Sequence, residues 1–275
     1  MSIDTKVSAH WGKEGLWEAI LTMIDAAGLD TNNLTPDQLA PLDHLHGRGV
    51  DATRELLELI NPGPEMHLLD IGSGVGGPAR LAAKVYGSCV TGIDLTQEFC
   101  DVATMLTERT NLTDKVTIHQ ASALDLPFKD ESFDAAYSQN VSMNIIDKET
   151  FYSEAFRILR TDSLFICAEY AEGPGGPPVF PVPWALYQED SHLMRPNEIR
   201  QIIEGVGFEI IDFQDQSEIM IEFSKCAREK IASEGLPLMS SRVLLGDDGA
   251  LRLKNSARSI EEKRTIPIQV TCRRS

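Results

Sequence analysis

The sequence has no excess of basic side chains: 25 lysines and arginines stand against 42 aspartates and glutamates, giving a formal net charge of −17. Surfaces that bind the phosphate groups of nucleic acids or anionic lipids need clustered lysine and arginine, so we expect neither a nucleic acid nor an anionic membrane as a partner. No apolar run approaches membrane-spanning length, and the opening residues, MSIDTKVSAHWGKEG, lack a basic segment followed by an apolar one. These absences predict a cytoplasmic protein.

Paired cysteines are also missing. The cysteines are odd in number, and none forms a C-x-x-C pair; they are Cys89, Cys100, Cys167, Cys226 and Cys272. The pattern predicts reduced thiols and excludes a disulfide framework or a zinc site, and no other metal site is expected. With 275 residues, 42% of them hydrophobic, the chain is long enough to bury the core of one large domain or of one domain with a cap.

The first 60 residues predict an N-terminal helical cap. Apolar residues recur at helical spacing within 11–27, and a second helix is expected near 50–60. Between them, residues 34–41 are typical of a polar, proline-marked connection. The stretch NPGP then predicts a boundary, so we expect a cap over 1–60 and a main domain over 61–275.

Strands and helices alternate after this boundary. The expected strands are 66–71, 89–95, 116–121, 132–141, 164–172, 209–215 and 265–272, and the expected helices are 78–86, 97–110, 149–159 and 196–206. This alternation predicts an α/β fold with a doubly wound, mostly parallel sheet that binds ligands at the carboxyl ends of its strands. Residues 173–185, rich in proline, are expected to form an ordered loop, and 216–263 a helical insertion before the last strand.

A glycine-rich turn follows the first expected strand, within HLLDIGSGVGGPAR. Its glycines fit both the G-x-G-x-x-G turn that seats a dinucleotide pyrophosphate and a G-x-G-x-G turn, so they leave the cofactor open. Asp70 would repel a pyrophosphate but would accept a charge-assisted hydrogen bond from the ammonium group of S-adenosylmethionine. Asp94 follows the glycines by about 20 residues, a spacing that suits a carboxylate bridging two ribose hydroxyls.

Three separated segments, HLLDIGSGVGGPA, VTGIDLT and ASALDLPFKDESFDAAYSQ, resemble the class I S-adenosylmethionine-dependent methyltransferases over most of residues 60–215. The resemblance implies a Rossmann-like methyltransferase fold and S-adenosyl-L-methionine as the cofactor. The residues implied in cofactor binding are Asp70, Gly72, Ser73, Gly74, Gly76, Asp94, Leu95, Ser122, Ala123, Leu124 and Gln139. Ser122 stands where the family usually has aspartate, so we expect the backbone of Ala123 and Leu124 to carry more of the adenine recognition.

A narrower resemblance lies outside the cofactor motifs. The segments LDHLHGRGVDAT, SQNVSMNIIDKE, AEGPGGPPVFPVPWA and LMRPNEIR look like the sarcosine and dimethylglycine N-methyltransferases, which make glycine betaine. The resemblance implies a small amine acceptor. It also leads us to expect histidine where this chain has Asn140.

The candidate catalytic and acceptor-binding residues are His46, Asn140, Met143, Asn144, Tyr170, Trp184 and Arg195. Tyr170 and Trp184 could offer aromatic faces to an ammonium group, and Arg195 could pair with a substrate carboxylate. Methyl transfer from a sulfonium is a direct displacement, so proximity supplies much of the acceleration, and a tertiary amine needs no base.

Three alternatives stay open: a nicotinamide oxidoreductase, a non-catalytic S-adenosylmethionine sensor, and a natural-product or other small-molecule N-, O- or C-methyltransferase. The sequence does not fix the acceptor or the oligomeric state, and it is compatible with a homo-oligomer.

Overall fold

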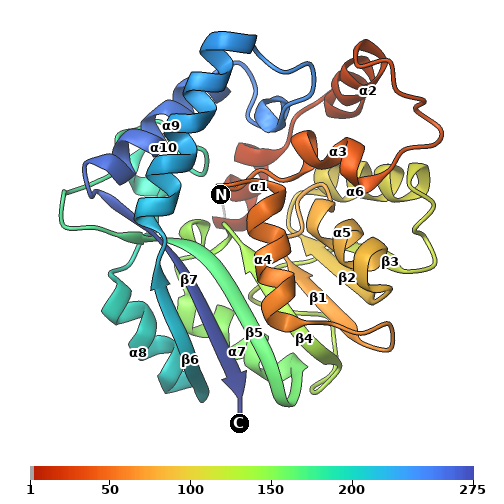
Figure 1. Ribbon diagram of the computed structural model, residues 1–275. Coiled ribbons are helices and arrows are strands. Elements are labelled where there is room, and N and C mark those ends of the chain that lie inside the picture. The colour runs from red at the N-terminus through yellow and green to blue at the C-terminus, as the bar shows by residue number, and fades with distance from the viewer. Residues whose placement is uncertain (1–2) are drawn as a thin grey trace.

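The computed structural model describes residues 3–275, and a seven-stranded sheet forms its centre (Figure 1). The strands are β1 (His67–Ile71), β2 (Cys89–Asp94), β3 (Val116–Gln120), β4 (Phe133–Gln139), β5 (Leu159–Glu172), β6 (Phe208–Asp215) and β7 (Thr265–Arg274). Their order is β3-β2-β1-β4-β5-β7-β6; β7 runs antiparallel to its neighbours, and the pairs from β3 through β5 are parallel. This architecture confirms the predicted doubly wound, mostly parallel sheet.

Helices cover both faces of the sheet. They are α1 (Ile3–Trp11), α2 (Leu16–Ala26), α3 (Pro36–Asp43), α4 (Val50–Ile60), α5 (Gly77–Tyr86), α6 (Gln97–Arg109), α7 (Lys148–Ile158), α8 (Pro196–Val206), α9 (Ser217–Glu234) and α10 (Gly249–Glu261). Side chains alternate between faces along a strand, so Leu68 packs with α4 and α5, whereas Leu69 packs with α7 and α8. The apolar run of β1 is thus buried on both sides.

One expected connection is instead a helix. Residues 34–41 contain the start of α3, which begins at Pro36 after a capping box between Thr35 and Gln38. Proline fits the first turn of a helix because its missing N–H would have no intrahelical partner there. Pro36, which predicted an irregular connection, is therefore the first residue of a helix.

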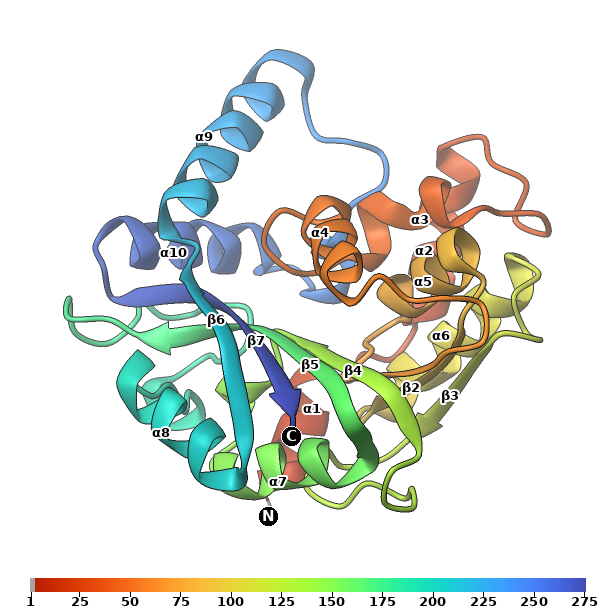
Figure 2. The ribbon, with the colours of Figure 1, turned by 60° about the horizontal axis from the view of Figure 1, so that its bottom comes forward.

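The predicted helical insertion before the last strand is present as α9 and α10. Figures 1 and 2 both place these helices beyond one end of the sheet. The 3-10 turn Ser241–Leu244, between α9 and α10, contacts α2 and α3. The insertion and the N-terminal helices therefore meet, and the division of the chain at residue 60 stays a prediction. Within residues 3–275, no helix is long and apolar enough to cross a membrane.

Candidate functional site

The carboxyl ends of β1, β2 and β4 open into a cavity of about 1540 Å³, whose other walls come from α3, α9 and α10. Most of the site residues proposed from sequence line it: His46, Asp70, Gly72, Ser73, Gly74, Asp94, Leu95, Ser122, Ala123, Leu124, Gln139, Asn140, Met143, Asn144, Tyr170 and Trp184. Segments that are far apart in the chain, from Asp4 to Glu261, therefore meet at the end of the sheet where parallel α/β folds bind their ligands.

Two predicted site residues do not line the cavity. Arg195 is exposed at the N-cap of α8, where its N–H donates to Oε2 of Glu198 at 2.9 Å. The structure thus corrects its expected place beside an acceptor carboxylate. Gly76 is the N-cap of α5 with a φ of 80°, and a Cβ there would lie 2.8 Å from Nη1 of Arg80. Close packing behind the turn explains this glycine.

The glycine turn uses its own N–H groups internally. Those of Gly72 and Ser73 both donate to the carbonyl of Ile93 at 2.8 Å, and that of Gly74 donates to Oδ2 of Asp94 at 2.9 Å. A pyrophosphate site needs such N–H groups free to face the anion. The arrangement therefore disfavours a nicotinamide dinucleotide at this turn.

Gly74 is the turn residue that leaves the most room for a ligand. Its φ is 53°, and a Cβ built on it meets no protein atom within 4 Å, although the residue lines the cavity. At Gly72, by contrast, a Cβ would lie 2.3 Å from Cγ2 of Val141. Gly72 is therefore required for packing of the turn against the segment after β4, whereas Gly74 keeps the cavity wall free of a side chain.

Asp70 is a buried carboxylate with capacity for a cationic partner. It is 2% exposed, and its Oδ2 has no hydrogen-bond partner among the described residues. Burial raises the pKa of Asp70 to about 8, and the Asp94 carboxylate adds to the rise while the Tyr137 hydroxyl opposes it. An ammonium group would satisfy this oxygen and favour the ionised carboxylate. These features fit the methionine end of S-adenosylmethionine.

The second carboxylate is held by backbone donors. Oδ2 of Asp94 accepts from Gly74, and Oδ1 accepts from the N–H of Thr96 at 2.9 Å. Each oxygen retains a second lone pair, so the carboxylate can also accept from ribose hydroxyls. Asp94 thereby connects the glycine turn to the end of β2.

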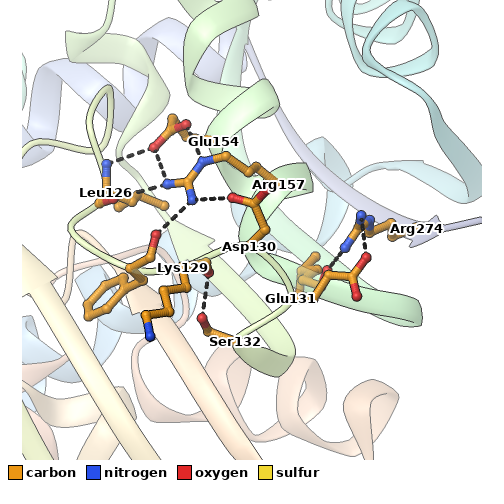
Figure 3. Close-up of polar contacts among 10 residues, drawn as sticks. Leu126, Lys129, Asp130, Glu131, Ser132, Glu154, Arg157 and Arg274 are labelled. Atoms are coloured by element: carbon orange, nitrogen blue, oxygen red, sulfur yellow. Dashed lines mark hydrogen bonds and ion pairs between the residues drawn. The ribbon is translucent and has the colours of Figure 1, made fainter.

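Arg157 of α7 holds the segment after β3 in place through hydrogen bonds and ion pairs (Figure 3). Its guanidinium donates to the carbonyls of Leu126 and Phe128 and forms ion pairs with Glu154 and Asp130. At the start of the segment, Oγ of Ser122 accepts from the N–H of Leu124 at 3.3 Å. That N–H is thus engaged within the turn, which reduces the expected share of the Leu124 backbone in adenine recognition.

A buried hydrogen-bond network shapes the chain after β4. The carboxylate of Glu169 accepts from the hydroxyl of Ser138 and from the N–H groups of Val141 and Ser142 at 2.8–2.9 Å. Nζ of Lys148 donates to the carbonyl of Ser142 at 2.6 Å, and burial lowers the pKa of this lysine to about 8. Between β4 and this loop, Asn140 adopts a φ of 61°, a conformation that asparagine tolerates better than most residues.

Asn144 and Trp184 join the loop after β4 to the proline-rich loop. Nδ2 of Asn144 donates to the carbonyl of Trp184 at 2.7 Å, and its Oδ1 accepts from Nε1 of Trp11 at 3.3 Å. The Trp184 indole is buried, stacks on Tyr170 with ring centres 4.9 Å apart, and donates to Ser191. These contacts make the aromatic pair part of a packed wall.

Sequence reasoning missed a polar network that approaches the cavity from LDHLHGRG. Arg80 and Asp43 form a fully buried ion pair with Nη2 and Oδ2 2.7 Å apart, and Oδ1 of Asp43 lies 3.5 Å from Nε2 of His44. His44 and His46 both contact the hydroxyl of Thr53, a residue of α4. The sequence could have indicated this network through one aspartate and two histidines within four residues. Nothing in the sequence indicates that Thr53 or Arg80 belongs to it.

The far part of the cavity is apolar. We define the apolar chamber as the surface formed by Met220, Phe223, Ala227 and Ile231 of α9 together with Leu253 of α10. Phe223 is 41% exposed although it belongs to this wall. Basic side chains also line the cavity at this end, namely Arg228, Lys230, Arg242, Lys254 and Arg258. Of these, Arg228 and Arg258 are paired with Glu261 and Glu262.

Comparison with known proteins agrees with this site. Residues 69–167 match the model of the methyltransferase domain family. The chain is 31% identical over 174 residues to the O-methyltransferase cnsE of Penicillium expansum, a match covering 62% of each chain. It is 28% identical over 194 residues to a sarcosine/dimethylglycine N-methyltransferase of Halorhodospira halochloris, covering 68% of this chain and 69% of the relative.

The fold is shared with a solved structure of Haemonchus contortus phosphoethanolamine N-methyltransferase 2 in complex with phosphomonomethylethanolamine and S-adenosylhomocysteine. The TM-score is 0.76 at 20% identity, over 99% of this chain and 60% of that one. Residues 69–167 are thus similar to the methyltransferase domain family, and the chain has the Rossmann-like methyltransferase fold. The predicted fold is confirmed, and these matches agree with the predicted enzyme class and with S-adenosyl-L-methionine as the predicted cofactor. The match spans less than two thirds of the fungal relative.

Proposed function

We propose that this chain transfers a methyl group from S-adenosylmethionine to a small-molecule acceptor that is larger and more apolar than an amino acid. The observation that carries the proposal is the continuity of the apolar chamber with the glycine turn in one cavity of about 1540 Å³. Apolar side chains such as Phe223, exposed at a cavity wall, are the surface that a bound ligand would cover.

In this proposal the two carboxylates and the turn hold the cofactor, whose sulfonium supplies an electrophilic methyl group. Asp70 binds the ammonium group, Asp94 the ribose hydroxyls, and the segment 122–124 the adenine. Gln139 lies between this half and the acceptor half, where His46, Asn140 and Met143 face the acceptor. Asn144, Tyr170 and Trp184 form the wall that orients it and excludes water.

Methylation of sarcosine or dimethylglycine towards glycine betaine is the second candidate. It is supported by the Halorhodospira relative and by the local resemblance over FPVPWA and LMRPNEIR. A buried substrate carboxylate needs a cationic partner, however. Arg195 does not line the cavity, and the basic side chains that do, such as Lys230 and Lys254, lie at the end of the apolar chamber rather than at the glycine turn. We therefore rank this candidate below an apolar acceptor.

A labelled-methyl assay distinguishes the two candidates. The purified chain is incubated with methyl-labelled S-adenosylmethionine and with either dimethylglycine or 2-naphthol, a bicyclic phenol that serves as the apolar probe. We expect label in the naphthol product only. We also expect Phe223→Ala to raise KM for 2-naphthol several-fold, while the Kd of S-adenosylhomocysteine stays within about twofold. Preferential labelling of dimethylglycine would contradict the proposal.

A further inference from the structure

The hydroxyl of Thr53 is the meeting point of three polar side chains. It lies 3.0 Å from Nε2 of His46, 3.1 Å from Nδ1 of His44 and 3.2 Å from Oε1 of Gln139. Thr53 is fully buried and does not line the cavity, whereas His44, His46 and Gln139 do. One threonine thus connects the acceptor half of the site with the end of β4.

The number of protons available to this cluster determines the tautomer of His46. A threonine hydroxyl has one proton and two acceptor lone pairs. Because the oxygen of Gln139 can only accept, the proton of Thr53 is directed to it. With that proton committed, Nε2 of His46 donates to a lone pair of the Thr53 oxygen, which places the proton of neutral His46 on Nε2 and leaves the lone pair on Nδ1. The nearest contact of Nδ1 is the Gly47 carbonyl at 3.4 Å, at the outer limit of hydrogen bonding.

We propose that Thr53 is a positioning residue that holds His46 in the Nε2-protonated form, so that Nδ1 can take a proton from the methyl acceptor. This inference rests on the proposed function and narrows its substrate class to molecules with an O–H or N–H proton to lose. As the acceptor lone pair forms its bond to the methyl carbon, the acceptor proton passes to Nδ1, and the electron pair of the broken carbon–sulfur bond stays on sulfur. A tertiary amine such as dimethylglycine has no such proton.

The surroundings of His46 keep the ring neutral and offer the proton a way out. Burial lowers the pKa of both His44 and His46 to about 3, so both rings are uncharged before the reaction. A base with so low a pKa takes a proton only from a strong acid, so the transfer to Nδ1 accompanies formation of the bond to the methyl carbon, which makes the acceptor proton acidic. The protonated His46 then gives up its proton readily. A second cavity of about 50 Å³ touches His46 and is lined by Gln216 and Gln269. It is large enough for one or two waters with polar partners, which can carry the proton away.

The first test reads the tautomer directly. Nitrogen NMR of histidine-labelled protein, saturated with S-adenosylhomocysteine, distinguishes protonated from unprotonated ring nitrogens, and His46→Gln assigns the signal. We expect the Nε2-protonated form in the wild type and in Thr53→Ser, and a mixture of tautomers in Thr53→Val. Thr110→Val is the matched control: this buried threonine donates only to the backbone carbonyls of Leu106 and Thr107. A wild-type His46 with its proton on Nδ1 would overturn the inference.

The second test measures turnover of 2-naphthol by the same variants. General base catalysis is worth about 10²–10⁴-fold, so we expect Thr53→Val to lower kcat by about tenfold or more, with little change in KM. Thr53→Ser should recover most of this loss, and Thr110→Val should resemble the wild type. Equal rates in Thr53→Val and wild type would contradict the role of Thr53. If 2-naphthol is not methylated at all, the proposed function fails, whereas the NMR result still decides the tautomer.

Discussion

Asp70 and Tyr137 occupy directly paired positions on the parallel strands β1 and β4, so their side chains share one buried face of the sheet. The Tyr137 hydroxyl lies close enough to oppose the rise in the Asp70 pKa, but Oδ2 of Asp70 has no hydrogen-bond partner of good geometry among the described residues. Buried polar atoms without partners are costly, and a cationic ligand beside them would recover that cost. The pair therefore links the stability of the chain to the occupancy of its site.

Cofactor affinity should depend on pH through Asp70. Its pKa is about 8 without ligand, and an ammonium ligand would lower it, so binding below pH 8 releases a proton. We expect the affinity for S-adenosylhomocysteine to rise from pH 6 to pH 8. Calorimetry in buffers of different ionisation enthalpy measures both the affinity and the proton release.

Asp70→Asn should remove this pH dependence and weaken binding by about tenfold or more. The folded pKa of Asp70 lies above the unfolded value, so its ionisation costs the unliganded protein stability as the pH rises towards 8. We therefore expect the unliganded Asp70→Asn protein to melt higher than the wild type at pH 8. A wild-type affinity that is flat between pH 6 and pH 8 would count against this assignment of Asp70.

The ion pair of Arg80 and Asp43 should be sensitive to the loss of one partner. Both side chains are buried, and burial raises the pKa of Asp43 while Arg80 opposes that rise. Removing the cation with Arg80→Met leaves an uncompensated carboxylate, at a cost of about 3–5 kcal/mol in the free energy of unfolding.

Two matched variants make this prediction specific. Asp43→Asn combined with Arg80→Met should recover a large part of the loss, because no unpaired charge remains. Arg54→Met removes an exposed pair with Asp37 and should cost less than about 1 kcal/mol. Urea unfolding measures all three variants, and equal losses for Arg54→Met and Arg80→Met would refute the prediction.

Arg157→Ala should loosen the segment after β3. The change removes donors to two carbonyls and two ion pairs at a partly exposed site, so we expect a loss of about 1–2 kcal/mol. Amide hydrogen exchange should accelerate within residues 126–131 more than in β1. Arg157→Lys should restore only part of the protection, because an ammonium group cannot reach both carbonyls and both carboxylates. Exchange that rises equally in β1 would mean that Arg157 has no local role.

The sequence predicted the sheet and the cofactor motifs because both depend on local patterns. Alternating strands and helices predict a doubly wound, mostly parallel sheet, and Asp70, Gly74 and Asp94 stand near strand ends, where spacing alone brings them together. The environment of Arg195 depends instead on how the chain after β5 is routed, which no local pattern records. Local patterns also could not indicate Thr53, because its role depends on a contact with Gln139, 86 residues away in the chain.

The apolar chamber could not be predicted from the sequence, for a related reason. Most residues of α9 are polar, and Met220 is the only one of its residues that is buried. Met220, Phe223, Ala227 and Ile231 do recur at helical spacing, but such a stripe is typical of packing against a core, so the sequence could not reveal that it lines a cavity.

The central claim, that the glycine turn of this cavity holds S-adenosylmethionine, is tested most directly by calorimetric titration of S-adenosylhomocysteine into two glycine variants. Gly74→Ala and Gly28→Ala each place a Cβ at a positive φ, 53° and 70°, where it meets no protein atom within 4 Å. Both should therefore lose a similar stability of about 1 kcal/mol, but only Gly74 lines the cavity. We predict wild-type affinity in Gly28→Ala and at least a tenfold loss in Gly74→Ala; equal affinity in the two variants would contradict the claim.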